Sequence, residues 1–75
     1  MSIELPPKAQ RLLDIIRAGG GDWVPRRDIA AALGKRRLNG GDLAYLEVLA
    51  ANHLIEAIQR RDDTPIGYRW EYRAL

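Results

Sequence analysis

Residues 23–34 read WVPRRDIAAALG. An aromatic and a β-branched residue open the stretch, which favours a short extended segment. The residues after Pro25 are strong helix formers with an acid in the first turn, and Gly34 supplies a left-handed stop. The stretch therefore predicts a short strand followed directly by a helix over residues 26–33.

The chain before this stretch predicts a helix over residues 7–18. Its apolar residues recur at i, i+3, i+4 and i+7, which places them on one side of the helix. They are Ala9, Leu12, Leu13 and Ile16. Two prolines stand at the start, where a helix tolerates proline. Gly19 is the predicted left-handed residue that ends this helix.

A third helix is predicted over residues 39–52. Asn39 and Asp42 have the spacing of a capping box at its start. The apolar residues of the segment form a stripe that we expect to be buried. They are Leu43, Leu46, Leu49 and Ala50. His53 follows the helix and is expected to be a cap or a partly buried polar group.

Two strands complete the chain, over residues 54–61 and 67–73, with turn-forming residues between them. In the second strand aromatic and charged residues alternate, which predicts one aromatic and one charged face. Trp23, Trp70 and Tyr72 are assigned to the core, although each could also stack on bases. The order of elements predicts an α+β domain with three helices and a small antiparallel sheet of two or three strands.

The composition fits one small domain over residues 1–75. The chain is 47% hydrophobic and has no cysteine, so neither disulfides nor a thiolate metal site can support its thin core. Its single histidine cannot build a zinc site alone. We expect no metal, no cofactor, no small-molecule effector and no catalytic residues. Without a long apolar run or a signal peptide, a cytoplasmic protein without membrane contact is expected.

Positive charge is concentrated in one part of the chain. Ten of the twelve cationic residues are arginines, which bind phosphate and carboxylate groups bidentately. Residues 26–37 carry five cations against one acid, whereas the other segments carry no positive surplus. This asymmetry favours a polyanionic partner.

The order of elements resembles the winged helix-turn-helix. Residues 23–25 and 28–34 look like the short strand and second helix of that superfamily. Residues 46–55 look like its third helix and the first wing strand, and residues 67–70 like the strand that returns from the wing. His53 stands where many members have glycine. The resemblance implies a third helix in the major groove of DNA and a wing on the backbone or minor groove.

We therefore expect binding of double-stranded DNA, mainly through phosphates, by a small transcriptional regulator or a mobile-element accessory protein. RNA is an alternative ligand. The expected contacts come from the basic stretch, the start of the third helix and the wing. They are Arg26, Arg27, Lys35, Arg36, Arg37, Asn39, Gly40, Gly41, Tyr45, Arg60 and Arg61. Arg36 or Arg37 could reach a guanine edge, whereas Asp62 and Asp63 could pair with the wing arginines and cancel them.

The outward face of the third helix leaves other interpretations open. It presents Ala44, Val48 and Ala51, where a helix that reads bases offers polar groups. This face could read thymine methyl groups, or the protein could recognise DNA shape with little sequence readout. Alternatively the face packs on another protein, including a second copy in a homodimer. The basic stretch could also be a solvated turn that pairs with Asp14 or Glu47.

Overall fold

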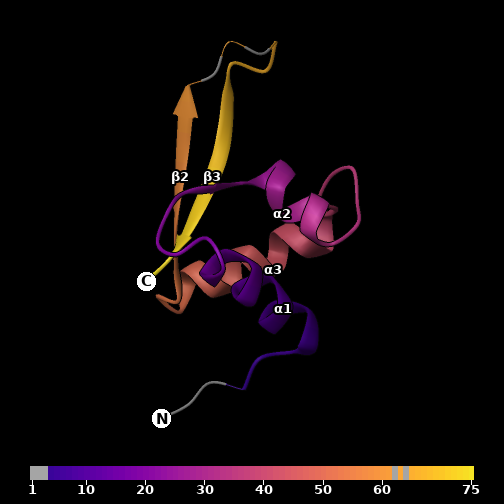
Figure 1. Cartoon of the computed structure of the whole chain (residues 1–75), viewed down its shortest axis with the longest axis vertical. Helices are drawn as coiled ribbons and strands as arrows, with labels where there is room; N and C mark the ends of the chain where they lie inside the picture. Colours follow the sequence, from indigo (N-terminus) through magenta and orange to yellow (C-terminus); the bar gives the residue numbers. More distant parts are fainter. Residues whose placement is uncertain (1–3, 62, 64) are drawn as a thin grey trace.

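The structure is a computed structural model that describes residues 4–61, 63 and 65–75. Within these residues it contains three helices and one three-stranded antiparallel sheet, so the predicted α+β class is confirmed. The elements are α1 (Pro7–Arg17), β1 (Val24–Pro25), α2 (Arg26–Ala32), α3 (Gly40–Ala51), β2 (Ile55–Arg61) and β3 (Tyr68–Ala74). This arrangement is compatible with a winged helix (Figure 1).

The buried side of α1 is the predicted one, because its four apolar side chains are at most 2% exposed. The end of the helix differs from the prediction. Gly20, not Gly19, adopts the left-handed conformation, with φ of 64°. A Cβ atom on Gly19 would lie only 2.8 Å from Cγ2 of Val24. Gly19 is therefore required for the close approach of β1 to the end of α1, not for its backbone angle.

The central strand of the sheet is β3, in the order β1-β3-β2. It pairs with β2 along its whole length, from Tyr68 to Ala74. It pairs with β1 only at Glu71 and Tyr72. The hairpin of β2 and β3 therefore projects well beyond the helical part of the molecule (Figure 1).

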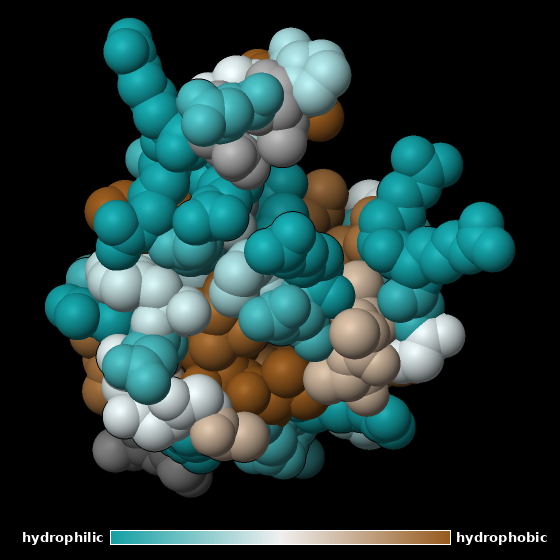
Figure 2. Space-filling view, turned by 45° about the horizontal axis from the view of Figure 1, so that its top comes forward, coloured by the Kyte–Doolittle hydropathy of each residue, from teal (hydrophilic) through white to brown (hydrophobic). Residues whose placement is uncertain are grey.

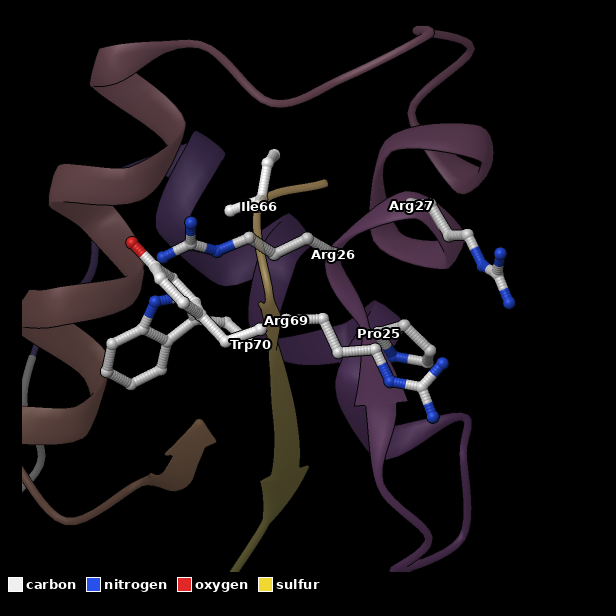
Figure 3. A pocket seen from close by; sticks show the side chains of 7 residues that line it. Pro25, Arg26, Arg27, Ile66, Arg69 and Trp70 are labelled. Atoms are coloured by element: carbon white, nitrogen blue, oxygen red, sulfur yellow. The ribbon is translucent and has the colours of Figure 1, made fainter. Parts of the chain in front are cut away.

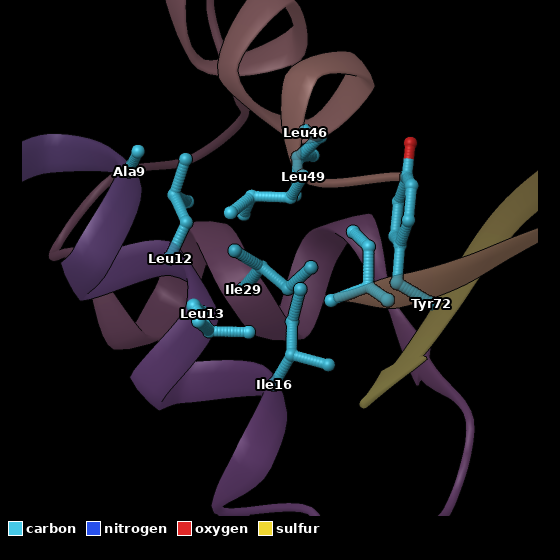
Figure 4. Close-up of a cluster of buried hydrophobic side chains, with 9 residues drawn as sticks. Ala9, Leu12, Leu13, Ile16, Ile29, Leu46, Leu49 and Tyr72 are labelled. Carbon is cyan, nitrogen blue, oxygen red and sulfur yellow. The ribbon is translucent and has the colours of Figure 1, made fainter. Parts of the chain in front are cut away.

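One apolar cluster joins the three helices to the base of the sheet (Figure 4). Ile29 comes from α2, Leu46 and Leu49 from α3, and Ile55 and Tyr72 from the two long strands. Each aliphatic side chain of this kind stabilises the fold by about 1.5–3 kcal/mol when it is fully buried. The Tyr72 ring closes one side of the cluster and directs its hydroxyl group away from the aliphatic side chains (Figure 4).

The capping box predicted at the start of α3 is confirmed. The Asn39 side chain accepts a hydrogen bond from the Asp42 backbone at 2.9 Å, and Asp42 accepts one from the Asn39 backbone at 3.0 Å. The predicted buried stripe of this helix needs correction. Leu43 and Ala50 are only partly buried, whereas the charged Asp42 is 1% exposed.

The two predicted faces of β3 are only partly confirmed. Tyr72 is buried, but Tyr68 is 47% exposed because it lies on the part of the hairpin that projects beyond the helices. Trp70 and Trp23, both assigned to the core, are partly buried. On the other face, Glu71 is only 6% exposed, so this face is not uniformly solvated.

The second residue after α3 has a left-handed backbone. Asn52 is the C-cap of the helix, and His53 follows it with φ of 58°. Its side chain is exposed, so the expectation of a partly buried polar group is wrong. The sequence departs from the winged-helix pattern here, since many members have glycine at this position, and a left-handed backbone strains any residue with a Cβ atom.

We expect His53→Gly to raise the free energy of unfolding by about 0.5–1 kcal/mol, because removal of the left-handed strain exceeds the extra chain entropy of glycine. Urea unfolding followed by circular dichroism measures the change. The matched control is His53→Ala, which removes the same side chain but keeps the strain and should change stability little. A loss of stability in His53→Gly would contradict this account.

Candidate nucleic-acid interface

The structure divides the predicted cationic contacts into two groups. In the first group the side chains bind other residues of the domain. Its members are Arg26, Lys35 and Arg60. In the second group the side chains are exposed and form no ion pair or hydrogen bond with another described residue. Its members are Arg27, Arg36, Arg37 and Arg61. The whole guanidinium group of each arginine in this second group is available to a ligand.

Arg26, the first residue of α2, is held against the aromatic residues of β3. Its guanidinium carbon lies 5.4 Å from the ring centroid of Trp70 and 5.8 Å from that of Tyr72. Its Nε donates a hydrogen bond to the Tyr72 hydroxyl at 2.9 Å. Figure 3 shows Arg26 extending toward Trp70 while Arg27 points the opposite way. Arg26 therefore attaches α2 to the sheet, and Arg27 is the outward cation of this helix start.

Lys35, in the turn before α3, is bound to a buried carboxylate. Its Nζ lies 2.9 Å from Oδ2 of Asp42, which also accepts the backbone N–H of Asn39. Lys8 of α1 lies 2.9 Å from Oδ1 of the same carboxylate, without the alignment of a hydrogen bond, so this contact is an ion pair. Asp42 thereby joins α1, the turn and α3.

This arrangement corrects the predicted pairing of the basic turn. Lys35 pairs with Asp42 and not with Asp14 or Glu47. Asp14 instead accepts a hydrogen bond from Gln10 within α1, at 2.9 Å. The capping spacing predicted that Asp42 would lie at the helix start, but it did not reveal that two lysines from other segments would reach it.

The charges around Asp42 change its acidity. Burial by itself would raise the pKa of Asp42, but the hydrogen bond from Lys35, with further contributions from Lys8 and the Asn39 backbone, lowers the pKa to about 2. In turn, Asp42 raises the pKa of Lys8. Asp42 is therefore ionised at neutral pH, and its negative charge is already neutralised within the domain.

Arg60, one of the two predicted wing contacts, lies on the sheet face opposite to the buried Tyr72, as the strand register requires. It forms an ion pair with Glu71, whose other oxygen lies 3.3 Å from Nε of Arg69. Its guanidinium group also lies over Trp23, 5.6 Å from the ring centroid. Arg60 is therefore exposed but held against the sheet, and Arg61 is the cation at the end of β2 that pairs with no other described residue.

Asp62 lies outside the described residues, so its pairing with the wing arginines stays a prediction. Asp63 is described and engages in an interaction of its own.

The sequence pattern did not predict the ring contacts of Trp23. Arg73, from β3, also lies over this ring, at 4.7 Å from its centroid. The alternating charged residues of β3 are the sequence signal that could have predicted these contacts on the sheet face of Arg60.

The start of α3 presents backbone rather than side chains. Gly40 and Gly41 are exposed, and a Cβ atom on Gly40 would meet no other atom within 4 Å. Asn39 uses its side-chain oxygen for the helix cap. Tyr45 is partly buried and packs against the core. Of these predicted contacts, the two glycines therefore remain open to a ligand.

The outward face of α3 carries the small and apolar residues that the sequence predicts there. Ala44, Val48 and Ala51 are all exposed, and Val48 is 45% exposed. Figure 2 shows apolar surface in the middle of one face of the molecule, with hydrophilic side chains projecting on either side. A helix face of this kind provides contact area but no hydrogen bonds to base edges.

A groove of about 360 Å³ lies between the start of α2 and the projecting part of β3 (Figure 3). The residues that line it are Pro25, Arg26, Arg27, Ile66, Tyr68, Arg69 and Trp70. A second hollow of about 250 Å³ lies between α3 and the sheet and shares Arg26 and Trp70 with the first. Ile66, Tyr68 and Arg69 were not predicted as binding residues, because the sequence alone did not show that α2 would face them.

Among the described residues, no group of three or more histidine or acidic side chains is placed to hold a metal ion. None of the helices in the described part of the chain has both the length and the apolar character that a bilayer span requires. Comparison of the chain with protein-family models, curated proteins and solved structures finds no match. The compatibility with a winged helix therefore rests on the arrangement of the elements themselves.

We expect the domain to lose stability in acid as the pH falls from about 4 to about 2. The pKa of Asp42 is lowered from 3.8 to about 2 by folding. A lowered pKa stabilises the fold above the unfolded value, and this stabilisation is lost as the pH falls through the folded value. The shift corresponds to about 2 kcal/mol of unfolding free energy at neutral pH. Urea unfolding across this pH range measures it.

Asp42→Asn removes the titrating group while keeping its shape. We expect this variant to be about 2–4 kcal/mol less stable at neutral pH, because it leaves two cations beside a buried neutral amide. Its stability should also depend less on pH in the acid range. Asp14→Asn, which changes an exposed carboxylate on α1, is the matched control and should behave like the parent chain. An unchanged acid profile in Asp42→Asn would refute the assignment.

Proposed function

We propose that this protein binds duplex DNA, mainly through phosphate groups, with the turn before α3 as the principal contact. The observation that carries the proposal is the state of Arg36 and Arg37. Both are exposed, both lack a partner among the described residues, and both stand directly before the N-terminus of α3. A helix N-terminus attracts anions, and unpaired arginines beside it bind phosphates.

The burial of Asp42 supports this proposal, because this acid is buried with its own partners and does not neutralise the arginines of the turn. Its two oxygens are occupied by Lys8, Lys35 and the Asn39 backbone. Asp42 therefore neutralises the charge of Lys35, whereas the charges of Arg36 and Arg37 remain available. Lys35 and Asn39 position the start of α3 in this proposal and are not phosphate contacts.

The remaining contacts follow from exposure. Arg27 on α2 and Arg61 at the end of β2 are further exposed cations and suit additional phosphates of the duplex. Gly40 and Gly41 are exposed, and Gly40, where a Cβ atom would meet no other atom within 4 Å, leaves the backbone of α3 open to close approach. Such binding tolerates many sequences and suits a transcriptional regulator or a mobile-element accessory protein.

The double substitution Arg36→Ala with Arg37→Ala tests the proposal. We expect weaker binding to a mixed-sequence DNA duplex and a salt dependence whose log–log slope is flatter by about 1.8, since each phosphate contact contributes about 0.9. The melting temperature should not change, because neither side chain has a partner among the described residues. Fluorescence anisotropy at several salt concentrations measures both quantities.

Two controls separate a local contact from general charge. Arg11→Ala with Arg17→Ala removes the same charge from exposed positions on α1 and should weaken binding much less. Lys35→Met should lower stability, because it leaves Asp42 with fewer partners. If the parent chain does not bind duplex DNA at low salt, or if the α1 variant loses as much affinity as the turn variant, the proposal fails.

The exposed face of α3 favours a second candidate function, association with a protein. Val48 is exposed between Ala44 and Ala51, and apolar surface of this kind is typical of interfaces. Under this candidate, Val48→Glu disrupts a dimer or complex and leaves DNA affinity nearly unchanged. Analytical ultracentrifugation of the parent chain and the variant measures the change. This candidate is excluded if the parent chain stays monomeric and if every partner that it binds is also bound by Val48→Glu.

A further inference from the structure

We propose that the groove between α2 and β3 binds an extended acidic segment of a partner protein, which pairs with the open edge of β3. The groove lies between the start of α2 and residues 68–70. Among the described residues, the groove excludes Arg36 and Arg37 and shares only Arg27 with the proposed DNA contacts, so it is a second binding site whose existence does not depend on DNA binding.

The first support is the unpaired edge of the central strand. β1 contributes only two residues to the sheet, opposite Tyr72 and Glu71. The strand stops there because Pro25 has no N–H group to donate and α2 begins at the next residue. Within the described residues, β3 therefore has β2 as its only strand partner over residues 68–70.

An open strand edge carries unpaired N–H and C=O groups and is a template for another strand. Here the groove runs beside it, and Tyr68, Arg69 and Trp70 both form the edge and line the groove. Binding by strand addition obtains its affinity from the backbone and its specificity from pockets for alternate side chains. The groove volume of about 360 Å³ lies in the range of ligand sites.

The second support is charge. Arg26, Arg27 and Arg69 border the groove, and the described residues that line it include no acid. Arg26 uses its Nε for Tyr72, and Arg69 directs its Nε toward Glu71. Their terminal guanidinium groups remain able to bind a carboxylate, which arginine does with strong charge-assisted hydrogen bonds.

The third support is exposed apolar surface at the same place. Ile66 is 73% exposed and Tyr68 is 47% exposed. Successive side chains of a strand point to opposite faces, so a strand added here would turn alternate residues toward Tyr68 and Trp70 and the others toward the side of Arg69. The segment that fits therefore alternates apolar and acidic residues.

A second copy of this chain does not meet these requirements. Pairing two copies of this edge would bring Arg69 and the neighbouring arginines of both molecules together, and like charges across a strand pair are destabilising. The occupant is therefore an acidic partner rather than another molecule of the same protein.

The test uses a fluorescein-labelled, end-blocked hexapeptide of alternating glutamate and valine, titrated with the full chain. We expect saturable binding and slower hydrogen exchange at those amides of residues 68–70 that point away from β2. Arg69→Ala should weaken binding about tenfold, as expected for loss of a charge-assisted contact. Ile66→Ser should weaken binding as well. Arg17→Ala removes the same charge from an exposed position on α1 and should leave binding unchanged.

Two further peptides and one nucleic acid complete the design. The same peptide with N-methyl groups on its backbone keeps the charges but cannot pair as a strand, and the lysine–valine version reverses the charge; neither should bind. The proposal is overturned if the N-methylated peptide binds equally, if Arg69→Ala binds as the parent does, or if no binding occurs. It is also overturned if an oligothymidylate displaces the peptide in an Arg69-dependent manner, since the groove would then hold nucleic acid.

Discussion

The buried carboxylate of Asp42 is the interaction on which the helical part of this protein depends. It completes the capping box of α3 with Asn39 and holds Lys8 from α1 and Lys35 from the preceding turn. A buried carboxylate is costly unless its charge is compensated, and three chain segments must be in place to compensate it. Since Lys35 is bound to Asp42, Arg36 and Arg37 are the cations of the turn that have no partner among the described residues.

The second constraint is the shortness of β1. Since Pro25 ends the strand and Arg26 begins α2, the sheet has three strands only at its base, where Tyr72 joins the core. Arg26 then packs on Trp70 and Tyr72 and holds the helix beside the hairpin. The projecting part of β3 therefore lies beside the start of α2 and not beside a third strand. The groove and the open edge result from this direct connection of β1 to α2.

Local patterns predicted the elements well, because the helix periodicity, the capping pair and the turn residues act over a few positions. They failed where a distant segment determined the outcome. Gly19 has its role because Val24 approaches it, and Glu71 is buried because cations from both long strands cover it. The charge pattern indicates the basic stretch as a candidate site, but it does not separate Arg26 and Lys35, which bind within the domain, from the other cations.

The sequence by itself determined the element order, the α+β class, the buried side of α1 and the small apolar face of α3, since each depends on the spacing of residues near one another in the chain. Only the tertiary structure decided which cations are available to a ligand. It also decided that Asp42 is buried and that the edge at residues 68–70 is open. These properties depend on which side chains from separate segments meet. Ion pairs and strand pairs form between segments that are distant in the sequence, so local patterns do not predict them.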